Sequence, residues 1–143
     1  MYNLTMNNTK PLEGIRVIDL THMLSGPYGS MILADLGCET IKVEPLTKGE
    51  GTRRLLENDP DYSFNGTGAY FYTLNRNKKS ICIDLKNHEG LKVFNDLVKV
   101  SDIVISNFSA GVTKKLNIDF EALKEVNPRI ITCTVSGFGE DGP

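Results

Sequence analysis

Short apolar runs rich in β-branched residues alternate with stretches of helical periodicity along most of the chain. The runs predict five strands, at residues 15–20, 40–44, 80–85, 102–106 and 129–135. Start and stop signals between them predict helices at residues 27–36, 88–100, 110–116 and 120–126. Strands that alternate with helices form right-handed βαβ units. The pattern therefore predicts an α/β fold with a Rossmann-like, open and mostly parallel sheet flanked by helices.

One long stretch, residues 45–68, follows neither period and contains Gly, Pro, Asn and Asp, which predicts a loop. A long irregular stretch in a compact domain is more often functional than idle. In an open parallel sheet, ligands bind beyond the carboxyl ends of the strands, close to the point where the strand order reverses. We therefore expect the ligand-facing segments at residues 21–26, 45–54, 84–86, 107–111 and 136–143.

Composition and charge narrow the classes of protein. The chain has 143 residues, of which 40% are hydrophobic and 24% charged, so we expect one domain with a real core. Its 16 Lys and Arg against 18 Asp and Glu give a net charge of −2, which argues against a nucleic-acid partner but allows a small basic patch for one anionic ligand.

The beginning of the chain carries no sign of export or membrane insertion. No apolar run approaches the roughly 18 residues of a membrane-spanning helix. Residues 1–10 have neither a charged n-region nor an apolar h-region. We predict a cytoplasmic protein with no membrane partner, a disordered tail over residues 1–10 and one domain portion over residues 11–143.

The three cysteines, Cys38, Cys82 and Cys133, lie far apart and form no C-x-x-C pair. No histidine stands near them at ligand spacing, so we expect no metal site. We expect all three to be small buried hydrophobic residues in a reducing compartment.

A G-x-G-x-x-G match at Gly137, Gly139 and Gly142 directly follows the fifth predicted strand. Such a motif cradles a pyrophosphate when it follows the first strand of a dinucleotide fold. Glu140 and Asp141 would place two carboxylates where the diphosphate must lie. We therefore interpret the match as a glycine-rich turn.

A few polar residues fall at the predicted strand ends. Lys86 follows the third strand and Lys115 lies in the helical stretch after the fourth, so both can reach an anion there. His22 lies two residues past the first strand, with no Ser, Cys or carboxylate at an obvious partner position. Capping and ion pairing explain Asp19 and Asp84 adequately.

Read in order, the strand-end segments form a series of short motifs. They are PLEGIRVIDL (11–20), SGPY (25–28), ADLG (34–37), IKVEP (41–45), GEGTR (49–53), NRNKKS (75–80), DLK (84–86), DIVISNF (102–108), NPR (127–129), SGFG (136–139) and GP (142–143). Each motif alone is weak, but the ordered series resembles the amino-terminal part of the family III CoA-transferases, the group that contains formyl-CoA and carnitine CoA-transferases.

The resemblance implies a CoA thioester bound across the strand ends as a substrate, with no tightly bound cofactor. The acyl group would pass between carboxylic acids through an aspartyl anhydride and then an aspartyl-CoA thioester. Lys86 and Lys115 would pair with CoA phosphates, while Phe108 offers an apolar face and Asn107 a bidentate amide. The family's CoA contacts carry over to His22, Met23, Leu24, Ile83, Asp84, Leu85, Lys86, Asn107, Phe108, Ser109 and Lys115.

Some positions depart from the family pattern. Many members have Asn-Phe-Arg-Pro-Gly where this chain has NFSAG at residues 107–111, so a cation beside the phosphates is missing. Pro45 stands where some members have Arg. Lys115 replaces an Arg, which keeps the charge but loses the planar fork.

The resemblance also places the nucleophilic Asp beyond Pro143, together with a second, smaller domain that is absent here. We therefore assign no catalytic residue and expect the isolated chain to be inactive. The full-length parent is expected to be an interlocked homodimer that takes a CoA thioester and a carboxylic acid.

Two other interpretations stay open. An α-methylacyl-CoA racemase shares this half of the molecule and transfers a proton next to a thioester carbonyl. The loop at residues 20–27, LTHMLSGP, looks more like the transferases. A non-enzymatic α/β binding module, complete at this length, is the alternative from a different class.

Overall fold

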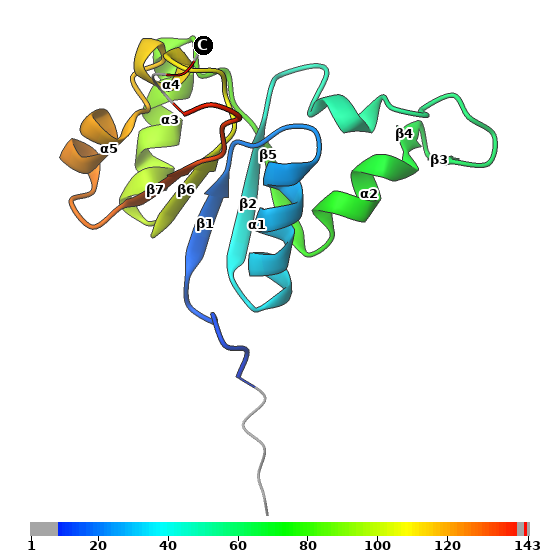
Figure 1. Ribbon diagram of the computed structural model, residues 1–143, viewed down its shortest axis with the longest axis horizontal. Coiled ribbons are helices and arrows are strands. Elements are labelled where there is room, and N and C mark those ends of the chain that lie inside the picture. The colour runs from blue at the N-terminus through cyan, green and yellow to red at the C-terminus, as the bar shows by residue number, and fades with distance from the viewer. Residues whose placement is uncertain (1–8, 140–141, 143) are drawn as a thin grey trace, which may run out of the picture.

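Five parallel strands lie side by side in one sheet, in the order β5-β2-β1-β6-β7 (Figure 1). The computed structural model describes residues 9–139 and residue 142. The chain begins at the central strand, adds two strands on one side, and then crosses back to add two on the other. The predicted α/β fold is confirmed, and the strand order reverses between β1 and β6. The strands are β1 (Arg16–Asp19), β2 (Glu39–Glu44), β5 (Lys78–Cys82), β6 (Ile103–Ser106) and β7 (Ile131–Thr134).

Helices cover both faces of the sheet. Val17 and Ile18 are successive residues of β1, so their side chains point to opposite faces. Val17 belongs to a buried cluster against which Leu33 packs. Ile18 belongs to a larger cluster that contains Phe94 and Leu123. One helix therefore covers the first face and two cover the second; they are α1 (Ser25–Asp35), α3 (His88–Lys99) and α5 (Phe120–Val126), with the short helix α4 (Val112–Lys115) before α5.

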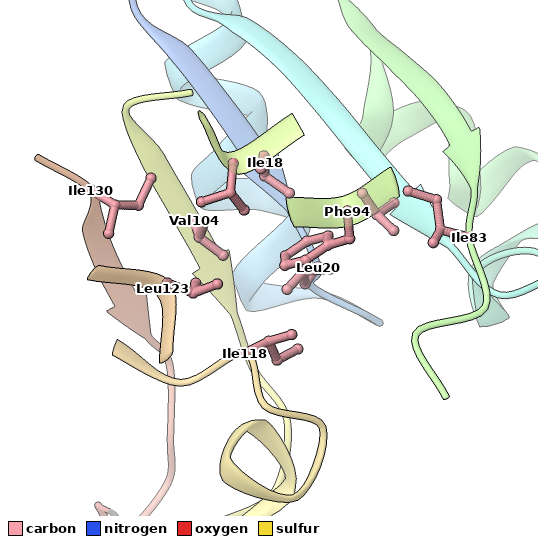
Figure 2. Packing of buried hydrophobic residues seen from close by; sticks show 10 residues of the cluster. Ile18, Leu20, Ile83, Phe94, Val104, Ile118, Leu123 and Ile130 are labelled. Atoms are coloured by element: carbon pink, nitrogen blue, oxygen red, sulfur yellow. The ribbon is translucent and has the colours of Figure 1, made fainter. Parts of the chain in front are cut away.

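The larger cluster is the main core of the domain (Figure 2). Phe94 and Val98 on α3 are fully buried. They pack with Ile18 and Leu20 of the central strand segment and with Val104 on β6. Asn87 is the N-cap of α3, because its side chain accepts a hydrogen bond from the Glu89 backbone N–H at 2.9 Å. The core therefore holds α3 against one face of the sheet.

The third predicted strand, residues 80–85, is displaced in the structure, where β5 spans Lys78–Cys82. Its pairing with β2 ends at Glu44 and Cys82, and the Ile83 N–H still donates to the Glu44 carbonyl at 3.0 Å. The chain then turns, because the Asn87 N–H donates to the Asp84 carbonyl at 3.1 Å. Gly90 permits this turn, since a Cβ at residue 90 would collide with the Asp84 backbone.

The stretch predicted as a loop, residues 45–68, contains regular elements and leads into an additional helix. These elements form an arm that projects away from the sheet (Figure 1). Asn65 and Gly66 both have positive φ angles, 51° and 72°, as a two-residue hairpin turn requires. The arm consists of a 3-10 turn η1 (Gly51–Arg53), an antiparallel hairpin β3 (Ser63–Phe64) and β4 (Thr67–Gly68), and helix α2 (Ala69–Asn75).

The prediction of three buried cysteines is correct only for Cys38. Cys82 and Cys133 are exposed because they lie on β5 and β7, the two edge strands of the sheet. Most of the expected tail, residues 1–8, lies outside the described residues. In the part of the chain that is described, no helix is long and apolar enough to cross a membrane.

Truncating Phe94 to alanine tests the main core. We expect Phe94→Ala to lower the free energy of unfolding by about 3–5 kcal/mol, because it leaves a cavity between α3 and the sheet. Val93→Ala is the matched control, since Val93 is the preceding residue and is 50% exposed. The control should cost less than about 1 kcal/mol in urea denaturation. Equal losses from the two variants would contradict this account of the core.

Candidate functional site

A cleft of about 420 Å³ opens at the carboxyl edge of the sheet. It lies beside the point where the strand order reverses, which is the general ligand position in open α/β sheets. Its apolar wall comes from several strand ends and loops and includes Leu20, Val43, Ile83, Leu85, Phe108 and Leu116. Its polar lining includes His22, Glu44, Asp84 and Lys86.

A second cavity of about 750 Å³ adjoins the cleft and shares Leu85, Lys86 and Leu116 with it. Lys115 on α4 also lines this cavity, so Lys86 and Lys115 border one space. Within residues 9–139, no Asp or Glu carboxylate lies within 4.0 Å of either ammonium group. The two cavities together form a groove, which is apolar at one end and cationic at the other. We call it the strand-end groove.

The structure brings together seven of the residues predicted from the resemblance. They line the strand-end groove and are His22, Ile83, Asp84, Leu85, Lys86, Phe108 and Lys115. Four others, Met23, Leu24, Asn107 and Ser109, do not line it. Met23 and Leu24 are 52% and 54% exposed. For all eleven residues, contact with CoA remains a prediction.

Asn107 has a role within the fold. Its Nδ2 donates to the His22 carbonyl at 2.8 Å, and its Oδ1 accepts from the His22 N–H at 2.8 Å. One donor and one acceptor of the amide are therefore used inside the protein. Asn107 ties the loop after β1 to the loop after β6, and so fixes the backbone that carries the His22 ring.

A buried ionic cluster lies beneath this loop. Asp19 is fully buried, and its Oδ2 accepts from Lys78 Nζ at 2.9 Å and from Ser30 Oγ at 2.7 Å. Its Oδ1 accepts from the Thr21 N–H at 2.8 Å. Lys42 Nζ lies 3.7 Å from Asp19 Oδ2 and donates to the Thr21 carbonyl at 2.8 Å. Residues from β1, β2 and β5 thus meet at one buried point.

These contacts decide the protonation of the cluster. Burial acts to raise the pKa of Asp19, but Lys42, Lys78 and the hydrogen bond from Thr21 outweigh it and leave the pKa below its usual value. Burial lowers the pKa of Lys78, and the charge of Lys42 adds to that effect against the pull of Asp19. Asp19 therefore stays ionised at neutral pH, where it stabilises both ammonium groups.

Glu44 at the end of β2 anchors the arm to the sheet. Its carboxylate accepts from Arg53 Nε at 2.7 Å and Arg53 Nη2 at 2.6 Å, and from Ser80 Oγ at 2.5 Å. Burial acts to raise the pKa of Glu44, but the hydrogen bonds from Arg53, Ser80 and the Glu50 N–H lower it to about 2. The Arg53 guanidinium also stacks on the Phe71 ring, 3.6 Å from its centroid.

Glu50, the residue before η1 at the start of the arm, is also fully buried. Its Oε1 accepts from the Met23 N–H at 2.9 Å and lies 3.9 Å from His22 Nδ1. No carboxylate stands at an obvious partner position of His22 in the sequence, but the fold brings Glu50 to it from the long loop. Burial and the charge of Lys42 lower the pKa of His22, against opposing effects from Glu50, Asp19 and Glu44. The imidazole is neutral at pH 7 and packs on Phe108, with ring centroids 5.7 Å apart.

The loop that carries His22 has a strained backbone. Met23 has a φ of 67°, in the left-handed region that side chains disfavour. Such conformations persist where surrounding contacts determine them. Here Glu50 holds the Met23 N–H and Asn107 holds His22. Gly26 lets α1 pack closely on this loop, since a Cβ there would come within 2.5 Å of the Thr21 side chain.

Sequence reasoning attributed Asp19 to capping and ion pairing, but it missed Lys42, Glu44 and Glu50 as buried charged residues of the site. A signal for two of them was present, because Lys42 and Glu44 alternate with apolar residues in a strand and so share one face of the sheet. Glu50 carried no signal of its own. Among the described residues, no group of three or more His, Cys, Asp or Glu side chains could hold a metal ion.

The strand-end groove lies at the switch point of an open parallel sheet, which is the usual position of a ligand site in this class of fold. Comparison with known proteins then identifies the family. The family model for CoA-transferase family III matches residues 12–143. The chain belongs to CoA-transferase family III, and it corresponds to the amino-terminal portion of its members.

Individual relatives agree with this assignment. Succinyl-CoA:glutarate CoA-transferase of Homo sapiens is 41% identical over 139 residues, which cover 96% of this chain and 31% of that protein. Acetyl-CoA:oxalate CoA-transferase of Acetobacter aceti is 42% identical over 133 residues, which cover 93% and 33%. The crystal structure of a CAIB/BAIF family protein from Brucella suis matches with a TM-score of 0.85 and 39% identity, covering 94% and 35%. The chain thus spans about a third of the length of the relatives it matches.

The pKa of Glu44 predicts how stability depends on pH. A carboxyl whose pKa is about 2 when folded and about 4.5 when unfolded stabilises the fold fully above pH 4.5, and the contribution is lost as the pH falls through 2. The difference corresponds to about 3 kcal/mol. In urea denaturation between pH 6 and pH 2.5, Glu44→Gln should be less stable than wild type at pH 6. Its free energy of unfolding should also fall less steeply on acidification. Parallel curves for the two proteins would contradict the assignment.

Proposed function

We propose that residues 11–143 form the CoA-binding portion of an enzyme that transfers CoA between carboxylic acids. The observation that carries the proposal is the meeting of Lys86 and Lys115 at the cationic end of the strand-end groove. The two lysines come from different parts of the chain, one after β5 and the other on α4. Neither forms an ion pair with the described carboxylates, so both are available to an anionic ligand.

The groove suits the chemistry of a CoA thioester. Phosphate groups form strong charge-assisted hydrogen bonds with lysine ammonium groups. The rest of the molecule is uncharged and long, and the apolar cleft beside the lysines offers it Leu116, Ile83 and the face of Phe108. We place the phosphates near Lys86 and Lys115 and the uncharged portion toward His22.

No described residue takes the role of the nucleophile in this proposal. Asp19 is buried and occupied by Lys78, Ser30 and Thr21. Asp84 accepts the Lys86 N–H at 3.0 Å and lies beside the proposed phosphate position. We propose that the nucleophilic Asp follows Pro143 and that the isolated chain does not catalyse transfer. A second, smaller domain and a second subunit of an interlocked homodimer would complete the enzyme.

Transfer between carboxylic acids is favoured over proton transfer next to a thioester carbonyl. The support for this choice is that the similar relatives from Homo sapiens and Acetobacter aceti are both named as CoA-transferases. Membership of the same family also favours part of an enzyme over a complete non-enzymatic module.

Removing the two lysines tests the proposal. We expect Lys86→Ala combined with Lys115→Ala to weaken CoA binding about 100-fold, since each charge-assisted contact contributes about 1.5 kcal/mol. The dependence of the affinity on salt should weaken in the same variant. Titration calorimetry at two salt concentrations measures both effects.

Lys114→Ala is the matched control for this experiment. Lys114 precedes Lys115 on the same short helix but lines a different cavity, beside Asp119 and Thr132. Lys114→Ala removes one positive charge, as each of the two substitutions in the double variant does, and should leave CoA affinity within about twofold of wild type. If the double variant bound CoA as tightly as wild type, the placement of the phosphates would be wrong.

A further inference from the structure

Glu50 is unusual among the carboxylates of this chain. It is fully buried, yet no Lys or Arg nitrogen of the described residues lies within 4.0 Å of it. A buried carboxylate without a bonded cation is costly to the fold. The hydrogen bonds that this carboxylate accepts offset part of that cost. The groups that donate them therefore indicate which parts of the structure Glu50 holds in place.

The contacts of Glu50 join the arm to the loop at residues 22–24. On the arm side, its Oε2 accepts from the Thr52 N–H at 3.1 Å and from the Thr52 hydroxyl, and its own N–H donates to Glu44 Oε2 at 2.7 Å. On the loop side, its Oε1 accepts from the Met23 N–H and faces His22 Nδ1. One carboxylate thus holds the strained Met23 backbone and lies 3.9 Å from the His22 ring.

The opposite side of the same loop is held by Asn107. Together the two side chains fix the backbone of the loop that carries the His22 ring, and this ring packs on Phe108 in the wall of the cleft. Without Glu50, the left-handed Met23 backbone would lose the hydrogen bond that offsets its strain, and the loop would relax away from this wall.

We propose that Glu50 is a positioning residue that presets the loop at residues 22–24, and with it the His22 ring, for binding of the CoA thioester. This inference rests on the proposed function, because it names what holds the apolar end of that binding groove. Glu50 does not touch the ligand in this proposal. It acts through Met23 and His22.

The experiment uses Glu50→Gln in the full-length protein that contains this chain. The variant keeps the shape of the side chain but removes its charge and one acceptor oxygen. We expect CoA affinity to fall about tenfold, as for loss of a buried charged hydrogen-bond partner. In the background of His22→Ala, Glu50→Gln should have a much smaller effect, since the two residues act as one unit.

A second measurement does not depend on CoA. The groups that face His22 are Glu50 on the arm, Lys42 and Glu44 on β2, and Asp19 on β1. Removing the Glu50 charge should shift the titration of the His22 imidazole to lower pH, followed by NMR. Glu39 lies at the opposite, amino end of β2, so Glu39→Gln should not shift the titration of His22.

A core variant separates positioning from general destabilisation. Val98→Ala lowers stability from within α3, where Val98 is fully buried in the main core. It should leave both CoA affinity and the His22 titration unchanged. If wild type binds CoA and Glu50→Gln binds equally well with an unshifted His22 titration, the positioning role is overturned. If wild type itself does not bind CoA, the proposed function fails instead, whatever the His22 titration shows.

Discussion

The buried contact between Asp19 and Lys78, with Lys42 beside it, is the constraint on which the rest of the site depends. It joins the central strand β1 to β2 beside it and to β5 on the far side of β2. Charges removed from water must find partners, and losing one partner of a buried pair costs about 3–5 kcal/mol. The strand ends therefore have one arrangement in which all three charges are satisfied, and the loop after β1 starts from that fixed point.

Each further part of the site is built on this arrangement by another polar contact. Lys42 donates to the Thr21 carbonyl, which sets the direction in which the chain leaves β1. Asn107 then pairs with His22 from the β6 side, and Glu50 pairs with Met23 from the arm. The arm is in turn fastened to β2 by the bidentate contact between Arg53 and Glu44. The groove is therefore shaped before any ligand enters, which reduces the entropy lost on binding.

The features that could be predicted from sequence are those with a local signal. Alternating strands and helices predicted the sheet. The rule that ligands bind beyond the carboxyl ends of the strands predicted that Lys86 and Lys115 lie at the edge of the sheet where the groove is found. The role of Asn107 could not be predicted, because its partner His22 is 85 residues away in the chain. The same holds for Glu50, whose contact with Met23 depends on how the arm folds back. The hairpin at Asn65 and Gly66 did carry a local signal, since this dipeptide favours a two-residue turn.

The charge of the groove follows from how the acidic residues are used. Three buried acids, Asp19, Glu44 and Glu50, lie in the same region as three cations, Lys42, Lys78 and Arg53, so the charges beneath the groove sum to zero, although only Asp19 and Glu44 form ion pairs with a Lys or Arg among the described residues. Lys86 and Lys115 form no ion pair with these acids and line the cationic end of the strand-end groove. A chain with a net charge of −2 can thus present a local positive field to an anion. Net charge excludes a broad basic surface, but the binding of one anionic group depends on which acids the fold has already paired.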